Sequence, residues 1–350
     1  MNIEGILLTI TLALWGAGCI VLGRVRKGAA GGGKTASADQ LSIIIPARNE
    51  EKNLPTLLGS ITVQAAQPCE IIVVNDASTD RTGQVAQQFG ACVVNSQPLP
   101  EGWRGKTWAC HQGAQAATGE LLLFLDADTW FEPGGLARVL ADYDGGAFSV
   151  GPFHAVRRAY EDLSLFFNFN MTIGTLPDGL FGQMLLVDRE SYRRVGGHEA
   201  VKGRILENCF LAQQFCAAGI PARSVTGRGV ISIRMYPNGL RELIAGWTKG
   251  FASGAGQTPR GVMVFVVAWM IGLMLPPLGW LVTGDWLGWG SAYLLCALQV
   301  AWFSRLVGAF RWFTAVLYPV PLIVFFVVFA WSILRSGKRV QWKGREILAD

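Results

Sequence analysis

Long uncharged apolar stretches stand at both ends of this 350-residue chain, and they constrain its fold more than any other feature. One covers residues 5–22, and three more cover residues 261–284, 286–303 and 312–334. Each is close to the roughly 20 residues that an α-helix needs to cross a bilayer. With a mean hydropathy of +0.33 and only 16% charged residues, the chain is predicted to be a multi-pass membrane protein with a globular middle.

The charges beside these stretches predict how the chain crosses. A basic cluster at residues 24–27 follows the first stretch, whereas a cleaved signal peptide, the alternative, carries its positive charges before the apolar run. We therefore expect an uncleaved anchor over residues 1–23 in the cell membrane, with the following domain in the cytoplasm. The tail, residues 336–350, is also basic, so one stretch within residues 261–335 should not cross completely.

A soluble alternative exists for the C-terminal stretches, because core helices of a large domain are also apolar. Tryptophans near their ends favour the membrane, since Trp is enriched where spanning helices meet the headgroups; these are Trp280, Trp286, Trp289, Trp302, Trp312 and Trp331. Two proline pairs, Pro276–Pro277 and Pro319 with Pro321, mark where a helix could break.

Charge and cysteine content exclude two other classes of protein. The net charge of +5, from 30 Lys and Arg against 25 Asp and Glu, is too mild for a nucleic-acid binder and fits contact with anionic headgroups. The seven cysteines form no CxxC pair and no Cys/His ligand spacing, which predicts reduced thiols and no structural zinc.

The middle of the chain is predicted to be a linker followed by one domain. Residues 24–40 are rich in Gly, Ala and Lys, which is typical of a flexible linker. Across residues 41–260, short apolar runs alternate with helix-like segments, and runs that are apolar on both faces are typical of buried parallel strands. The predicted fold is a doubly wound, Rossmann-like α/β sheet with its first strands at residues 41–45, 70–74, 91–94 and 120–125.

Polar clusters follow three of these strands, at the sheet edge where ligands bind in such folds. They are residues 46–50, 75–76 and 126–128. No GxGxxG follows the first strand and no GxxxxGK[ST] occurs, so a nicotinamide-dinucleotide or P-loop site lacks its phosphate-binding glycines. The chain needs another way to bind a nucleotide.

Carboxylates in these clusters favour a nucleotide diphosphate. Asp126 and Asp128 flank one alanine, and such a pair can hold Mg²⁺ or Mn²⁺ against a diphosphate, although a pair of turn carboxylates looks the same. Asp76 could accept hydrogen bonds from a uracil or a ribose. Lys106 could balance phosphate charge, unless it is an exposed loop lysine.

Three segments, in order and at fitting spacing, resemble the opening motifs of family 2 glycosyltransferases, which have a GT-A fold. They are residues 43–51, 73–80 and 124–128, and the resemblance continues through residues 182–189 and 195–198. More narrowly, the chain resembles the membrane glycosyltransferases of staphyloxanthin-type pathways, which act on the carotenoid acid diaponeurosporenoate; the pointers are residues 103–106, 234–236, 246–249, 253–256 and 342–345. The resemblance implies inverting transfer from a UDP-sugar, UDP-glucose above all, to a lipid acceptor.

Motif by motif, the resemblance also implies roles for residues. Asp76 matches the family's uridine-binding aspartate, Asp128 its metal ligand, and Asp126 would support the ribose or the metal. The loop after the first strand would flank the uracil, through Pro46, Arg48, Asn49 and Glu50, unless Arg48 and Glu50 only form a surface ion pair.

One departure from the family concerns the acceptor. Members that glycosylate hydroxyl groups usually carry Glu-Asp at an acceptor-side helix, where the Asp removes a proton, but this chain has Glu207-Asn208. The base is then Glu207 or is not needed. An acceptor carboxylic acid is already ionised because its pKa is about 4, so Asn208 predicts attack by a carboxylate and a glycosyl ester product. Glu207 could instead bind a sugar hydroxyl or cap the helix.

A second departure concerns Trp247. Processive synthases of the family carry Gln or Arg, two residues, then Arg-Trp, and here only the tryptophan matches, which favours a single transfer over chain elongation. Trp247 could close over the donor or the acceptor, or anchor the chain at the membrane surface. Arg234 is a candidate partner for an acceptor carboxylate.

Other interpretations stay open. The acceptor could be another membrane lipid, with a hydroxyl or a polyprenyl phosphate, or the chain could be a non-catalytic membrane protein that binds sugar nucleotides. The Phe-rich residues 165–171 could form a lip through which a lipid enters, although a buried core helix accounts for them equally.

Overall fold

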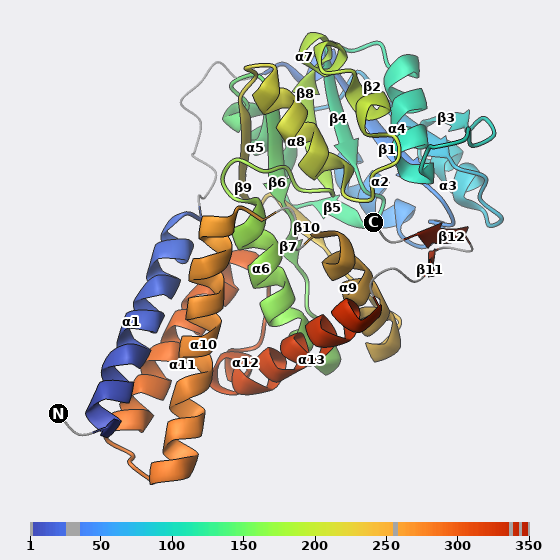
Figure 1. Ribbon diagram of the computed structural model, residues 1–350. Helices are drawn as coiled ribbons and strands as arrows, with labels where there is room; N and C mark the ends of the chain where they lie inside the picture. The colour runs from blue at the N-terminus through green and yellow to red at the C-terminus, as the bar shows by residue number, and fades with distance from the viewer. Residues whose placement is uncertain (1–2, 26–35, 255–257, 336–338, 343–344, 349–350) are drawn as a thin grey trace.

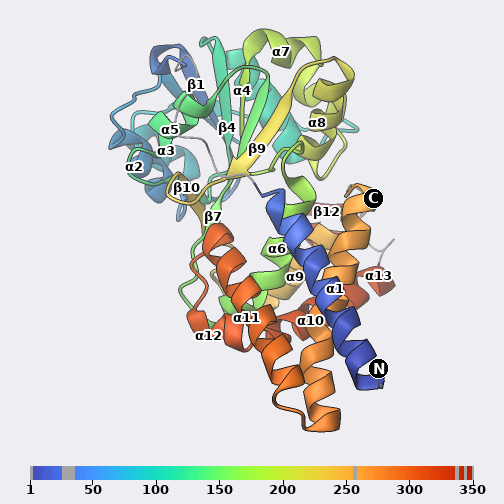
Figure 2. The same ribbon diagram turned by 90° about the vertical axis from the view of Figure 1, so that its left-hand side faces the viewer.

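The computed structural model describes residues 3–25, 36–254, 258–335, 339–342 and 345–348. Figures 1 and 2 show an α/β domain stacked on a bundle of helices. Most of the predicted linker, residues 24–40, lies outside the described residues. So does much of the predicted tail, whose described part pairs as two antiparallel strands, β11 Arg339–Trp342 and β12 Arg345–Leu348.

A seven-stranded sheet forms the centre of the α/β domain, in the order β3-β2-β1-β4-β8-β6-β9. The strands from β3 to β4 run parallel, as predicted. β8, which was not among the predicted strands, runs antiparallel to both of its neighbours and makes the sheet mixed. The strands are β1 Leu41–Ala47, β2 Glu70–Asn75, β3 Cys92–Asn95, β4 Leu121–Leu125, β6 Ala147–Gly151, β8 Met184–Asp188 and β9 Ala222–Thr226.

Helices cover both faces of this sheet because its strands are apolar on both faces. Ile43 and Ile45 pack with one set of helices, whereas Ile44, which points the other way, packs with another. All three side chains are fully buried, and each contributes about 1.5–3 kcal/mol by leaving water. The helices of the domain are α2 Leu54–Thr62, α3 Thr82–Gln88, α4 Gly105–Ala116, α5 Gly135–Asp142, α7 Arg189–Arg194 and α8 Glu207–Ala217, with the 3-10 helix η3 Gly197–Val201.

A small second sheet lies between the main sheet and the bundle (Figure 1). Its order is β5-β10-β7, with β5 Thr129–Phe131, β7 Phe153–His154 and β10 Ile231–Ile233. β5 follows directly on the Asp126–Asp128 segment at the end of β4. The carboxyl edge of the main sheet, where ligands were predicted to bind, therefore faces the bundle.

The bundle contains three helices that are long and apolar enough to cross a membrane: α1 Ile3–Gly23, α10 Arg260–Thr283 and α11 Gly288–Val307. The last predicted stretch is broken into α12 Trp312–Val316 and α13 Pro319–Arg335, whose apolar part falls short of that length. The break precedes Pro319, and α13 lies across the other helices (Figure 1). Of the three C-terminal stretches, this is the one that does not form a full span.

Buried polar and small residues fix the packing of the three long helices. Trp269 on α10 donates from Nε1 to Gln299 Oε1 on α11 at 2.7 Å, and Gln299 Nε2 donates to the Trp15 carbonyl of α1 at 3.2 Å. Gly18 leaves the room for this pair, because a Cβ there would lie 2.3 Å from the Trp269 ring. Hydrogen bonds of this kind hold spanning helices together in lipid.

The 3-10 helix η2 Ala159–Ser164 ties the two parts together through two adjacent buried carboxylates. Glu161 accepts hydrogen bonds from Arg234 Nε at 3.1 Å and Nη2 at 2.7 Å, just after β10. Asp162 pairs with Arg311 and accepts from Thr314 Oγ1 at 2.8 Å, beyond the end of α11. The connection between the α/β domain and the bundle is therefore ionic as well as apolar.

Helices α6 Leu165–Thr175 and α9 Leu240–Gly254 complete the junction. Phe166, Phe167 and Phe169 of α6 are buried in one cluster with residues of the bundle. The Phe-rich segment is therefore a core helix, the alternative to an open lip for lipid entry.

Candidate active site

The loops after β1 and β2 are interlocked at the carboxyl edge of the sheet. The side-chain oxygen of Asn49 accepts from the Thr79 backbone N–H at 2.8 Å, and the Asn49 N–H donates to Ser78 Oγ at 3.1 Å. Asn49 has a φ of 55°, a left-handed conformation that Asn tolerates better than most residues. The predicted uracil-flanking loop and the Asp76 loop are thus held in one fixed arrangement.

Arg48 and Asp76, one from each of these two loops, contact each other. Arg48 Nη1 donates to the Asp76 carbonyl at 3.0 Å and lies 3.9 Å from Asp76 Oδ2. Glu50 accepts from Asn53 Nδ2 at 2.6 Å, and Pro46 lies within β1 opposite Val74. Arg48 thus pairs with the buried carboxylate predicted to bind the base.

Lys106 sits at the centre of the site and bridges its two halves. Its Nζ lies 2.7 Å from Asp126 Oδ1 and 2.8 Å from Glu207 Oε1, and it donates to the Gly182 carbonyl at 2.8 Å. Burial alone would lower the pKa of Lys106, but the charges of Asp126 and then Glu207 outweigh it and raise that pKa above its ordinary value. Lys106 is therefore a charged side chain with three polar partners and not an exposed loop lysine.

Asp126 and Asp128 are placed differently although only one residue separates them. Asp126 faces Lys106, and its backbone N–H donates to the Gln183 carbonyl at 2.9 Å. Asp128 directly precedes β5, which pairs with β10 in the small sheet. The pair therefore lies between Lys106 of α4 and the small sheet.

These two carboxylates fit a divalent cation bound together with a diphosphate. Among the residues that the structure describes, no group of three His, Cys, Asp or Glu gathers at a point. Mg²⁺ is usually held by one or two carboxylates plus substrate phosphates and water, so a pair is a suitable donor set. Asp126 and Asp128 would hold such an ion, which would neutralise the diphosphate as it leaves.

Glu207 and Asn208 begin α8, and both are buried. Glu207 is committed to Lys106, and Asn208 Nδ2 donates to the Phe181 carbonyl at 2.7 Å. An aspartate at position 208 would set a carboxylate oxygen against that carbonyl, which is also an acceptor. The amide thus has a local structural role.

Trp247 and Arg234 are also committed to partners. The Trp247 ring is buried and stacks on Phe167 with 4.8 Å between ring centroids, and its Nε1 donates to Ser164 Oγ at 3.5 Å. Arg234 is the partner of buried Glu161. Neither side chain is placed as an open contact for a substrate, and the structure assigns Trp247 to the junction core.

Two residues near the site had no assigned role in the sequence. Gln183 holds Asp126 through its backbone, while its own buried Oε1 has no hydrogen-bond partner in the described structure. Tyr236 lies in the loop after β10, the strand that pairs with β5 just beyond Asp128. The Gly182–Gln183 segment belongs to a recognised motif, but no sequence signal placed the Tyr236 loop next to the strand that follows Asp128.

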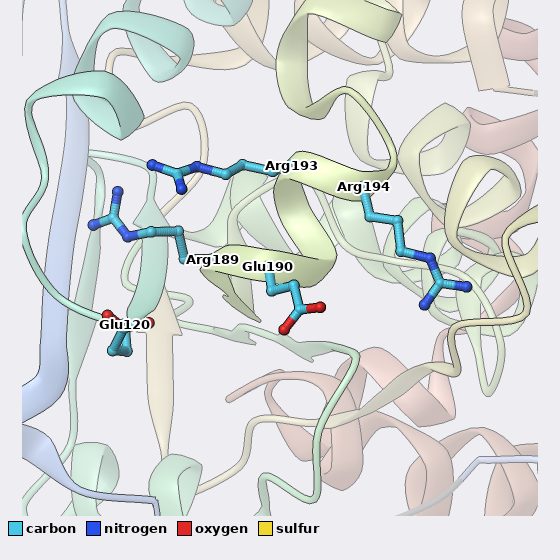
Figure 3. A pocket seen from close by; sticks show the side chains of 5 residues that line it. All are labelled: Glu120, Arg189, Glu190, Arg193 and Arg194. Carbon is cyan, nitrogen blue, oxygen red and sulfur yellow. The ribbon is translucent and has the colours of Figure 1, made fainter.

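A pocket of about 470 Å³ lies elsewhere, at the amino end of β4 (Figure 3). Glu120, which precedes β4, lines it together with Arg189, Glu190, Arg193 and Arg194 of α7. In Figure 1, α7 lies at the end of the α/β domain away from the bundle. This pocket is therefore distant from the aspartate cluster, which comprises Asp76, Asp126 and Asp128 at the carboxyl edge of the sheet.

Known proteins resemble this chain in sequence and in fold. Residues 42–166 match the model for glycosyl transferase family 2. A 4,4'-diaponeurosporenoate glycosyltransferase from Staphylococcus aureus is 34% identical over 329 residues, which cover 87% of this chain and 88% of the relative. The mannosyltransferase PcManGT from Pyrobaculum calidifontis, solved with GDP-Man and Mn²⁺, superimposes with a TM-score of 0.55 at 19% identity, covering 95% of this chain and 97% of that one.

Proposed function

Because the chain belongs to glycosyl transferase family 2, we propose that it moves a hexose, glucose in the simplest case, from a UDP-sugar to the carboxylate of a membrane carotenoid acid. One observation carries this proposal: the aspartate cluster lies at the sheet edge that faces the membrane helices. A water-soluble donor and a lipid acceptor can meet there. The relative from Staphylococcus aureus, named for a carotenoid acid, supports this class of acceptor.

The donor side is built from the two interlocked loops and the acidic pair. Asp76, braced by Arg48, would accept hydrogen bonds from the uracil or the ribose. Pro46, Asn49 and Glu50 would line the base. Asp126 and Asp128 would hold Mg²⁺ or Mn²⁺ against the diphosphate, and Lys106, 2.7 Å from Asp126 Oδ1, lies where it can add positive charge.

The acceptor side supports an anionic nucleophile. A hydroxyl acceptor needs a base, but Glu207 already pairs with Lys106 and position 208 carries an amide. A carboxylate oxygen can attack the anomeric carbon directly. The new carbon–oxygen bond then forms as the bond to the diphosphate breaks, UDP departs with that electron pair, and a glycosyl ester of inverted configuration results without a proton transfer.

The basic residues support a cytoplasmic site at the cell membrane. Arg24, Arg260 and Arg305 lie at the ends of α1, α10 and α11 nearest the α/β domain, and all three are exposed. No Lys or Arg occurs at residues 3–23 or 261–304, and the far end of the bundle carries Glu4 and Asp285. Positive flanks stay inside, so the catalytic domain would face the cytoplasm.

The membrane helices place the enzyme in the phase where a lipid acceptor is dissolved. Burial of apolar area is worth about 25 cal/mol per Å², so a long polyene partitions strongly into the bilayer. Its carboxylate stays at headgroup depth, next to a site at the edge of the sheet that faces the bundle (Figure 1).

The test is product identification with purified full-length protein in lipid vesicles, supplied with a carotenoid acid, UDP-glucose and Mn²⁺. We expect mass spectrometry to find the acid plus one hexose, and Asp128→Asn to abolish the product. The matched control is Asp144→Asn, because Asp144 is an exposed acid that pairs with Arg223 away from the cluster. If the hexose were found on another lipid, that lipid and not the carotenoid acid would be the acceptor. UDP-sugar binding without transfer would indicate a non-catalytic binding protein.

A further inference from the structure

Tyr236 occupies an unusual position between the catalytic edge and the membrane side. It lies in the loop that joins β10 to α9, with a φ of 56°, a left-handed backbone conformation that is costly for a bulky residue. Its carbonyl accepts a hydrogen bond from Tyr160 Oη at 2.8 Å, which anchors the strained loop to η2. A residue kept in such a conformation by its surroundings points to a specific role.

The strand pairing explains how this loop reaches the acidic pair. β10 pairs antiparallel with β5, and Ile233 lies opposite Thr129. Asp128 comes just before Thr129, and the chain beyond Ile233 runs alongside it toward Tyr236. The loop that carries Tyr236 is therefore joined to the Asp128 segment through the pairing of β10 with β5.

On its other side, the Tyr236 ring fills a notch in α9. A Cβ at Gly246 would lie 2.1 Å from ring carbon Cε1 and 2.6 Å from the hydroxyl oxygen, so position 246 has no room for a methyl group. Trp247 packs edge-on against the same ring, with centroids 5.8 Å apart. Trp247 in turn stacks on Phe167, which contacts Phe325 of α13 at 5.2 Å between centroids.

A continuous row of rings thus connects α13, the helix that lies across the bundle, to the catalytic edge. We infer that Tyr236 is a positioning residue: its ring is held against Gly246 and its backbone continues from β10, so through the pairing of β10 with β5 it sets the place of Asp128. This inference rests on the proposed function, in which Asp128 binds the cation that accompanies UDP. The aromatic ring supplies the contact with Gly246, so phenylalanine should replace tyrosine and alanine should not.

A methyl group at position 246 would push the ring by about 1.3 Å before it reached the ordinary contact distance of 3.4 Å. Shifts of about 1 Å at a reacting centre can change rates about a hundredfold, so a relayed and partly absorbed shift should cost about tenfold in cation-dependent UDP binding. The effect should disappear when the ring is absent, because the methyl group then has nothing to push.

The experiment is a double-mutant cycle on the full chain in lipid nanodiscs, with the Kd of UDP measured calorimetrically at several Mn²⁺ concentrations. We expect Gly246→Ala and Tyr236→Ala each to weaken Mn²⁺-dependent UDP binding about tenfold, Tyr236→Phe to stay within about twofold, and Gly246→Ala to add nothing in the Tyr236→Ala background. Gly261→Ala is the matched control, since a Cβ at that helical glycine meets nothing within 4 Å.

Wild-type binding in both alanine variants would overturn the inference. So would variants whose thermal unfolding temperature falls while the folded fraction binds UDP normally, because Tyr236 would then be structural only. If the wild-type protein showed no Mn²⁺-dependent UDP binding at all, the proposed donor site itself would be refuted, and this result is distinct from an unresponsive cycle.

Discussion

Replacing Lys106 with methionine should destabilise the protein and yet strengthen its hold on a free cation. Lys106 Nζ lies within 2.8 Å of both Asp126 Oδ1 and Glu207 Oε1, and the Glu207 side chain is only 5% exposed. Removing one partner of a buried ion pair costs about 3–5 kcal/mol, because the other charge stays buried without compensation. Asp126, at 28% exposure, can turn to water, so its share should be under about 1 kcal/mol.

We therefore expect Lys106→Met to lower the free energy of unfolding by about 3 kcal/mol, at the lower end of that range because the Lys106 side chain is itself 25% exposed. For a domain of about 200 residues, this corresponds to a fall of about 6–12 °C in the unfolding temperature. Adding Glu207→Gln should recover about half of the loss, since the uncompensated charge is then gone. Without Lys106, Asp126 is released, so Mn²⁺ should bind more tightly when no nucleotide is present, while UDP should bind more weakly.

The assay combines thermal unfolding followed by circular dichroism with calorimetric Mn²⁺ titration. Lys202→Met is the matched control, because Lys202 is exposed, and it should change stability by less than about 0.5 kcal/mol. A Lys106→Met variant as stable as the wild type, or one that Glu207→Gln does not rescue, would refute the reasoning that Lys106 is the compensating charge of a buried carboxylate.

Three further predictions concern other parts of the molecule. Asn208→Asp should lose about 1–3 kcal/mol of stability, because the donor to the Phe181 carbonyl is lost, and should gain no transfer to alcohol acceptors in a product assay. Burial, and then the positive charge of Lys106, lowers the pKa of His198 to about 3. Below about pH 6.5 the unfolded state therefore binds more protons than the folded state, so the free energy of unfolding should fall as the pH drops from 6.5 toward 3. In thermal unfolding measured at several pH values, His198→Gln should flatten this fall. Gln299→Leu should leave Trp269 Nε1 without its partner and cost about 0.6–1.7 kcal/mol in detergent unfolding, whereas a larger loss would mean that this pair organises the whole bundle.

Features with a local period could be predicted from the sequence. The strands around Ile43–Ile45 and Leu121–Leu125 are short apolar runs that end in polar residues, so both the sheet and its ligand-binding edge could be predicted from the sequence. Spanning helices are recognised by length, and the break in the last stretch is consistent with Pro319, at which α13 begins. The position of Asp126 and Asp128 followed from the same logic, because a strand end fixes where its loop lies.

Features that depend on distant pairs could not be predicted. The direction of β8, the bridge from Lys106 to Glu207 and the burial of Trp247 all arise from segments separated by about 40 residues or more, and no local period encodes them. Arg234 is the clearest case, since as an isolated arginine it could serve a substrate carboxylate. In the folded protein, buried Glu161 already occupies its guanidinium.

Position 208 carries an amide where a carboxylate would serve as the general base. The amide at position 208 led us to propose an acceptor that needs no deprotonation, and its hydrogen bond to the Phe181 carbonyl adds a structural reason for an amide there. The two reasons agree, because a site that needs no base is free to use position 208 for packing.

The central claim is that an already ionised lipid carboxylate attacks the sugar. The most direct measurement gives the wild-type protein in lipid vesicles equal amounts of a carotenoid acid and the corresponding alcohol, with UDP-glucose and Mn²⁺, and compares the two initial rates of hexose transfer by mass spectrometry. We predict product from the acid, cleavable by mild alkali as an ester, and none from the alcohol. Transfer to the alcohol at an equal or higher rate would contradict the account.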